Sequence, residues 1–149
     1  MTNMTLRDLL NQQDTTKFAT DAGTRAHRRM QQITIDGDTV HGDADTVAHI
    51  KSFPELLPFF VANAQTEVPV AGIIRGKFVS RRIDRMVTNH DKRQILVMDY
   101  KTDVSPDKFH NKYYTQVCEY LELLRAIYPE YTVLGYILWL HDFRLEAVQ

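Results

Sequence analysis

An acid and a base two positions apart end an apolar, strand-like run of the chain. Residues 95–101 read Ile-Leu-Val-Met-Asp-Tyr-Lys. Because successive side chains of a strand point to opposite faces, Asp99 and Lys101 should share one face and Tyr100 the other. A second carboxylate, Asp84, lies fifteen residues earlier in another strand-like segment. Two carboxylates that can hold a divalent cation, with a lysine to offset negative charge, indicate metal-dependent phosphodiester cleavage.

Three successive strands are expected to carry these residues. They span residues 66–74, 77–88 and 94–102, with Gly76 and residues 89–92 as the turns of an antiparallel meander. Alternation along the second strand predicts one shared face for Phe78, Ser80, Arg82, Asp84 and Met86. An inward carboxylate on that face would be costly unless it were paired or bound a cation.

Helical patterns flank the three strands. A helix over about 23–33 precedes them, and a longer helix over 107–128, ended by Pro129, follows. A buried strand over 131–140 and an edge strand over 143–148 come last. This order predicts an α/β fold in which helices flank a mixed sheet.

The long helix carries an apolar stripe with one polar interruption. The stripe consists of Tyr113, Val117, Tyr120, Leu121, Leu124 and Ile127. Gln116 interrupts it beside Val117, so its amide should have a defined partner. Tyr120 follows Gln116 by one turn and lies on the same helix face.

The remaining segments have weaker patterns. Residues 5–20 are weakly helical, and residues 36–43 are rich in Gly and Asp, which is typical of turns. Short helices are expected over 47–51 and 54–60, the second opened by its proline.

Composition indicates a single packed domain. A chain of 149 residues with 44% apolar residues is large enough to bury a core. Cys118 is the only cysteine, which excludes an intrachain disulfide or a four-cysteine cluster and favours a reducing, cytoplasmic setting. The first residues lack the basic flank and continuous apolar run of a signal peptide, and no membrane-spanning run is expected. A net charge of −1 does not favour strong nonspecific DNA binding.

Five segments, in order along the chain, resemble motifs of the RecB-like branch of the PD-(D/E)XK nucleases. They are Gly23-Thr24-Arg25-Ala26-His27, Glu67-Val68-Pro69, Ile83-Asp84-Arg85, Asp99-Tyr100-Lys101-Thr102 and Gln116-x-x-x-Tyr120. The resemblance covers about residues 20–148 and is closest to the C-terminal nuclease domains of AddA-type helicase–nuclease subunits. It implies one nuclease domain over residues 1–149 with a restriction-endonuclease-like core, α-β-β-β-α-β, and a peripheral segment over 1–19.

The resemblance also implies a metal site. Asp84 and Asp99 would bind Mg²⁺, or Mn²⁺ in its place, with the Tyr100 backbone carbonyl and His27 completing the shell. Glu67 would contact the metal through water or pair with a basic residue. Oxygen-rich coordination suits Mg²⁺, and an imidazole makes Mn²⁺ a good substitute. No iron–sulfur cluster is expected, because the cysteines of relatives that carry one are missing.

Roles for the other matching residues follow from the same resemblance. Lys101 would orient or help deprotonate the attacking water, and Gln116 and Tyr120 would support it or contact DNA. Phosphates would be contacted by Arg25, Arg28, Arg82 and Arg85. The family usually has glycine where this chain has Arg81, which could tighten a phosphate contact or obstruct the site.

The expected activity is DNA phosphodiester hydrolysis in recombination or double-strand-break repair, most simply as an exonuclease. No phosphate-binding Gly-x-x-x-x-Gly-Lys-Ser/Thr loop occurs, so a separate helicase or recombination partner is expected to deliver DNA. The chain would be an excised nuclease domain or a small autonomous relative. Two alternatives stay open: a noncatalytic DNA-binding or interaction module on a nuclease scaffold, and a structure-selective endonuclease of the junction-resolvase kind.

Overall fold

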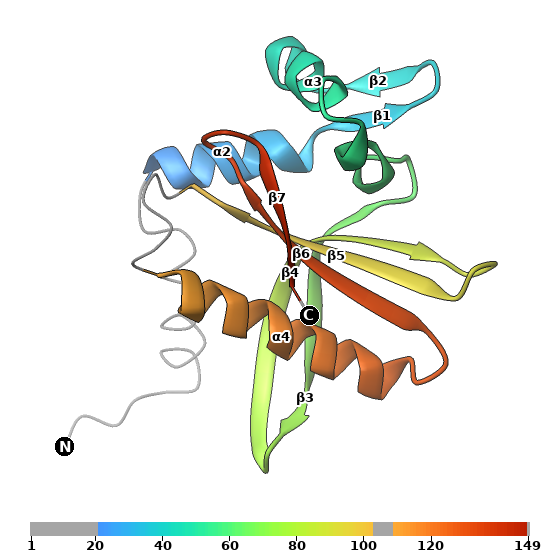
Figure 1. The fold of residues 1–149 in the computed structure, drawn as a ribbon, viewed down its shortest axis with the longest axis vertical. Coiled ribbons are helices and arrows are strands. Elements are labelled where there is room, and N and C mark those ends of the chain that lie inside the picture. Colours follow the sequence, from blue (N-terminus) through green and yellow to red (C-terminus); the bar gives the residue numbers. More distant parts are fainter. Residues whose placement is uncertain (1–20, 103–108, 149) are drawn as a thin grey trace.

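A five-stranded mixed sheet forms the centre of the structure, a computed structural model that describes residues 21–102 and 109–148 (Figure 1). Its strands, in spatial order, are β3 (Gln65–Ile74), β4 (Lys77–Asn89), β5 (Gln94–Lys101), β6 (Thr132–Trp139) and β7 (Arg144–Val148). The first three form the predicted antiparallel meander, β5 and β6 are parallel, and β7 is antiparallel to β6. The predicted α/β fold with a mixed sheet is confirmed.

Helix α4 (His110–Ile127) connects the parallel strands β5 and β6 and covers one face of the sheet. Parallel neighbours need such a crossover. Its buried residues include Val117, Tyr120, Leu121 and Leu124, as the apolar stripe predicts. The prediction that the stripe reaches Ile127 is wrong: this last residue of the helix is 51% exposed, because the covered face ends before it.

Close contact between α4 and β6 depends on a glycine. A Cβ built on Gly135 would lie 2.8 Å from Val117 Cγ1 and 2.9 Å from Leu121 Cδ2. A larger residue there would force the side chains of Val117 and Leu121 to shift. Gly135 therefore allows α4 to pack closely on the sheet. This packing sets the position of the helix that carries Gln116 and Tyr120.

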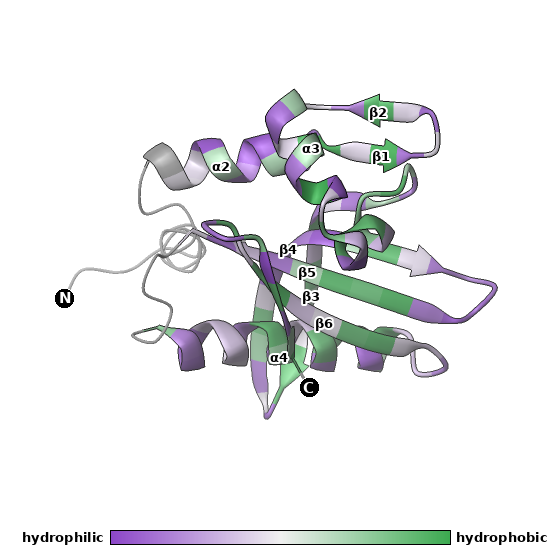
Figure 2. Ribbon diagram, turned by 45° about the horizontal axis from the view of Figure 1, so that its top comes forward, coloured by the Kyte–Doolittle hydropathy of each residue, from purple (hydrophilic) through white to green (hydrophobic). Residues whose placement is uncertain are grey.

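The opposite face of the sheet is covered by N-terminal elements (Figure 2). They are α2 (Asp21–Gln31), α3 (Ala44–Lys51) and the short 3-10 helix η1 (Pro54–Phe59). Asp43 caps α3, since its carboxylate accepts hydrogen bonds from the Thr46 backbone and hydroxyl. The core on this face joins Met30, Ile33, Ile50, Leu56, Phe60, Met98, Tyr100 and Leu138.

The segment predicted only as turns contains a small hairpin. β1 (Thr34–Asp36) and β2 (Thr39–His41) pair antiparallel around Gly37, whose φ is +59°. Strands of three residues are too short to show an alternating pattern, which is why the prediction missed them.

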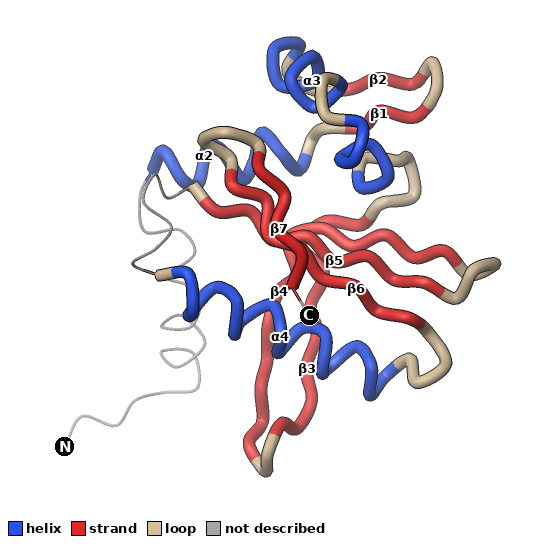
Figure 3. The backbone as a smooth tube through the Cα atoms, viewed as in Figure 1, coloured by secondary structure: helices blue, strands red, loops and turns tan. Residues whose placement is uncertain are grey.

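β4 leaves β5 part-way along its length (Figure 3). The β4–β5 pairs run from Asn89↔Gln94 to Arg85↔Met98 and stop there. β4 continues to pair with β3 as far as Ile74↔Lys77. Residues 77–83 of β4 therefore belong to a two-stranded ribbon, and Asp84 lies where that ribbon leaves the sheet.

Some predictions fall outside the described residues. These are the weak helix over 5–20 and the first residues of the helix expected from 107. Among the helices that the structure describes, none has the length and apolar character needed to cross a membrane.

Candidate active site

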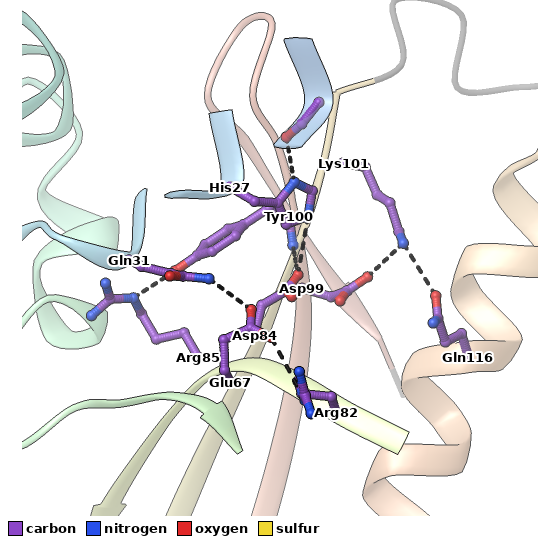
Figure 4. A network of polar contacts seen from close by, with 11 residues as sticks. His27, Gln31, Glu67, Arg82, Asp84, Arg85, Asp99, Tyr100, Lys101 and Gln116 are labelled. Atoms are coloured by element: carbon purple, nitrogen blue, oxygen red, sulfur yellow. Dashed lines mark hydrogen bonds and ion pairs between the residues drawn. The ribbon is translucent and has the colours of Figure 1, made fainter. Parts of the chain in front are cut away.

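Asp84 is held at the point where β4 and β5 separate. The Tyr100 backbone N–H donates to Asp84 Oδ2 over 2.8 Å, so a side chain takes the place of the interrupted ladder. Both Asp84 and its neighbour across the gap, Asp99, are fully buried. A backbone donor thus fixes one carboxylate beside the other (Figure 4).

Asp99 and Lys101 share a face of β5, as alternation predicts. Lys101 Nζ lies 2.9 Å from Asp99 Oδ2 and donates to Gln116 Oε1 over 3.1 Å (Figure 4). The same ammonium stands 4.3 Å from the ring centre of Tyr113, on α4. The structure therefore gives Gln116 the defined partner that its place in the apolar stripe requires.

Tyr120 contributes a buried hydroxyl near these charges. The residue is fully buried, and its Oη has no hydrogen-bond partner within the part of the chain that the structure describes. Burial, together with the charges of Asp99 and Asp84, raises the pKa of Tyr120 well above its usual range. Its hydroxyl therefore stays protonated and keeps a hydrogen to donate.

His27 reaches the carboxylates from α2. Its Nδ1 lies 2.9 Å from the Gly23 carbonyl, and Nε2 lies 3.6 Å from Asp84 Oδ2. Because Nδ1–H donates to the carbonyl, a neutral ring would turn the Nε2 lone pair toward the carboxylate. That geometry suits a proton or a metal cation between the two atoms.

The protonation of His27 predicts a pH dependence for the metal-free protein. Burial lowers the pKa of His27, but the nearby Asp84 carboxylate, the Gly23 carbonyl and the charge of Asp99 together outweigh it and raise the pKa above 6.5. The stability that the imidazolium contributes is therefore fully present below pH 6.5 and is lost as the pH rises through the raised pKa. Urea unfolding in EDTA should show wild type and His27→Gln converging as the pH increases. A difference that stays constant across the pH series would contradict this prediction.

Glu67 does not join the carboxylate pair directly. Its Oε1 accepts a hydrogen bond from Gln31 Nε2 at 2.9 Å, and its Oε2 lies 3.9 Å from Arg82 Nε. Glu67 has a φ of +52°, and the β3–β4 pairing passes over it and Asp84. Such a conformation costs about 1–3 kcal/mol in a non-glycine residue. Arg75, Arg93 and Phe143 also have positive φ, in turns between strands, so the conformation by itself does not mark a site. Of the two contacts predicted for Glu67, the structure shows the one with a basic residue.

The arginines predicted to contact phosphates differ in exposure. Arg25 and Arg28 are exposed on α2, and the side chain of Arg82 is 56% exposed. Arg81, at the position of the family's glycine, instead turns toward α4, where Nη2 lies 2.9 Å from Glu119 Oε2. That ion pair directs Arg81 to α4.

Arg85 is a correction to the sequence prediction. It is 2% exposed, and its guanidinium donates to the Tyr100 hydroxyl at 2.6 Å and to the Met30 carbonyl at 2.7 Å. It also donates to the Phe59 carbonyl and lies 4.5 Å from the ring centre of Phe60. Arg85 therefore joins α2, η1 and β5 inside the protein and cannot contact a DNA phosphate in this conformation.

The residues present fit a divalent cation. Within residues 21–102 and 109–148, no three side chains of His, Cys, Asp or Glu form a metal cluster. Mg²⁺ needs fewer protein ligands than three, because it is usually bound through one or two carboxylates with waters completing its shell. Asp84 and Asp99 supply two buried carboxylates, His27 lies on one side, and the Tyr120 hydroxyl lies near both charges.

Comparison with protein-family models gave no match, and comparison with curated proteins found no similar sequence.

Two contacts at the site were not predicted: that of Gln31 with Glu67 and that of Tyr113 with Lys101. Gln31 binds Glu67, and it follows His27 by four residues, so helical spacing alone places it on the same face of α2. Tyr113 was predicted as an apolar stripe residue, but its ring also contacts the Lys101 ammonium. No feature of the sequence distinguishes that second role.

Proposed function

We propose that this chain is a metal-dependent DNA nuclease with a restriction-endonuclease-like core, of the RecB/AddA type. The observation that supports it best is the joining of Asp84, Asp99 and Lys101 where two strands part. One carboxylate held by a backbone N–H, a second paired with a lysine, and an imidazole nearby are the parts that this hydrolysis requires.

Asp84, Asp99, the Tyr100 carbonyl and His27 would hold Mg²⁺ or Mn²⁺, which supplies charge neutralisation and activation of water when bound. Lys101 has three N–H donors, of which one goes to Gln116, and its charge forms an ion pair with Asp99. A remaining N–H can donate to the attacking water or to a phosphate oxygen, where it offsets the negative charge that develops. Hydrolysis would leave a 3′-hydroxyl and a 5′-phosphate.

The exposed arginines would act on the substrate without touching the bond that breaks. Tyr120 is fully buried, so its hydroxyl would support the charged residues of the site from inside the protein. Arg25 and Arg28 on α2, and Arg82 on β4, would bind phosphates and position the strand without reading its sequence. A helicase or recombination partner would deliver DNA to a chain whose own net charge is −1.

A panel of three substrates tests this function. In Mn²⁺ we expect degradation of a linear single strand, with a closed single-stranded circle left intact, as for an exonuclease that needs an end. Cleavage of the circle would make the enzyme an endonuclease, and preferred cutting of a four-way junction would make it a structure-selective one. Binding of all three without cleavage of any would leave a noncatalytic DNA-binding module.

Gln116→Leu tests the positioning of Lys101. The substitution keeps the size of the side chain but removes the acceptor of the ammonium, so we expect kcat to fall roughly 10- to 100-fold with little change in KM. Glu119→Gln, one turn further along α4, is the control and should leave kcat nearly unchanged. A rise in KM alone for Gln116→Leu would assign this residue to DNA binding instead.

A further inference from the structure

The ribbon formed by residues 68–83 has one covered face and one open face (Figure 1). Val70 and Ile74 are buried against α4 on the covered face. Alternation places three cross-strand pairs on the other face: Pro69↔Arg82, Ala71↔Ser80 and Ile73↔Phe78. We call these six residues the open strip. It starts beside Glu67 and Asp84 and ends near the tip of the hairpin.

The far end of the open strip is the most exposed apolar feature of the described residues. Ile73 is 68% exposed and Phe78 is 66% exposed, and the two are directly paired. In Figure 1 the hairpin tip that carries them extends past α4. An aromatic ring presented in this way, with one aliphatic neighbour, offers a flat surface to a planar ligand.

The charge of the ribbon has one sign. Residues 68–83 contain Arg75, Lys77, Arg81 and Arg82 and no acidic residue. Glu119 and Glu122 of α4 pair with Arg81 and Arg75. Arg82 lies on the open strip, where its Nε is 3.9 Å from Glu67 Oε2 and its side chain is 56% exposed. Together, a cation and an exposed ring match the phosphate and the base of a single nucleic-acid strand.

The size of the open strip also favours a nucleic acid over a protein. A standard protein–protein interface uses about 20–30 residues a side, far more than six side chains of one ribbon. A strand needs only a narrow track with stacking and phosphate contacts. Asp84 follows Phe78 by six positions, which is roughly 20 Å of strand at ~3.3 Å per residue. Several nucleotides of a bound strand could lie along that length.

We propose that the open strip binds single-stranded DNA next to the phosphodiester that is cut, with an unpaired base stacked on Phe78 and the backbone held by Arg82. This inference rests on the proposed nuclease function for the position of the cut, but the binding itself needs no metal. The substrate is accordingly a single strand, or an unpaired end, long enough to span from Asp84 to the hairpin tip.

Fluorescence anisotropy with a labelled single strand in EDTA and low salt tests the proposal. EDTA prevents cleavage, so the measurement reports binding alone. We expect Phe78→Ala to weaken binding roughly five- to 100-fold, the range that loss of one base–aromatic stack gives. Phe78→Leu, which keeps apolar area without a π face, should weaken it similarly, and Phe78→Trp should preserve it. Arg82→Gln should reduce the slope of log affinity against log salt by ~0.7.

The control is Ile127→Ala, an exposed apolar residue at the end of α4, which should bind like the wild type. Phe78 is exposed, so its variants should keep the melting temperature of the wild type. The proposal is overturned if Phe78→Ala or Phe78→Leu binds like the wild type, if the wild type prefers duplex, or if it binds no single strand.

The ribbon and the nuclease can fail separately. Binding that depends on Phe78, without any cleavage in Mn²⁺, would support DNA binding by the open strip and contradict the proposed nuclease activity. Cleavage by the wild type, with normal DNA binding by Phe78→Ala, would support the nuclease activity and contradict DNA binding by the open strip.

Discussion

Asp99→Asn is expected to lower the rate of DNA cleavage at least ~10³-fold. The substitution is nearly isosteric, but it removes a charge that would hold the cation and that pairs with Lys101 at 2.9 Å. Metal-derived stabilisation of a phosphoryl transition state is worth several kcal/mol, and each 1.36 kcal/mol is about tenfold in rate. Single-turnover cleavage of a labelled linear strand measures the loss.

Asp91→Asn is the matched control for Asp99→Asn. Asp91 is an exposed carboxylate in the turn between β4 and β5, away from the strand ends that carry the site. Its variant should cleave at the wild-type rate. If Asp99→Asn kept wild-type cleavage as well, the carboxylate pair could not be the catalytic centre.

Arg85→Ala is expected to destabilise the protein by about 3–5 kcal/mol. It leaves the Phe59 carbonyl and the Tyr100 hydroxyl without their Arg85 donor, removes one of two donors to the Met30 carbonyl, and leaves a void beside the Phe60 ring. For a chain of this size, each 1 kcal/mol shifts the melting temperature by about 2–4 °C, so a fall of roughly 6–20 °C should follow. Thermal unfolding followed by circular dichroism measures it.

Arg82→Ala provides the comparison on the same strand. Its side chain is 56% exposed, and replacing it should change stability by no more than ~0.5 kcal/mol. The opposite result would be an Arg85→Ala variant that is as stable as the wild type but binds DNA weakly. It would support the phosphate contact predicted for Arg85 from the sequence and contradict a structural role for its buried hydrogen bonds.

The sheet could be predicted because its strands have strong local signals. β4 and β5 are long, rich in β-branched and apolar residues, and separated by polar turns, so alternation placed Asp99 and Lys101 on one face correctly. Helical spacing likewise placed Gln116 in a stripe where it needed a partner, and that partner is Lys101. These features depend on short stretches of sequence, which periodicity describes well.

The parts that were missed depend on long-range packing. Arg85 follows Asp84 directly, and nothing local shows that it turns into a core built by α2 and η1, whose carbonyls lie more than 25 residues earlier. The separation of β4 from β5, and the left-handed conformation of Glu67 that accompanies it, break the regular pairing that alternation assumes. Both irregularities lie at the site, and local periodicity cannot describe them.

Metal dependence of cleavage tests the central claim most directly. Purified protein should degrade a labelled linear single strand when Mn²⁺ or Mg²⁺ is added, leave 5′-phosphate ends, and stop when EDTA removes the metal. Asp84→Asn should show no activity at any metal concentration. Absence of cleavage by the wild type across the whole Mn²⁺ range, or cleavage that survives EDTA, would contradict a metal-dependent nuclease at Asp84 and Asp99.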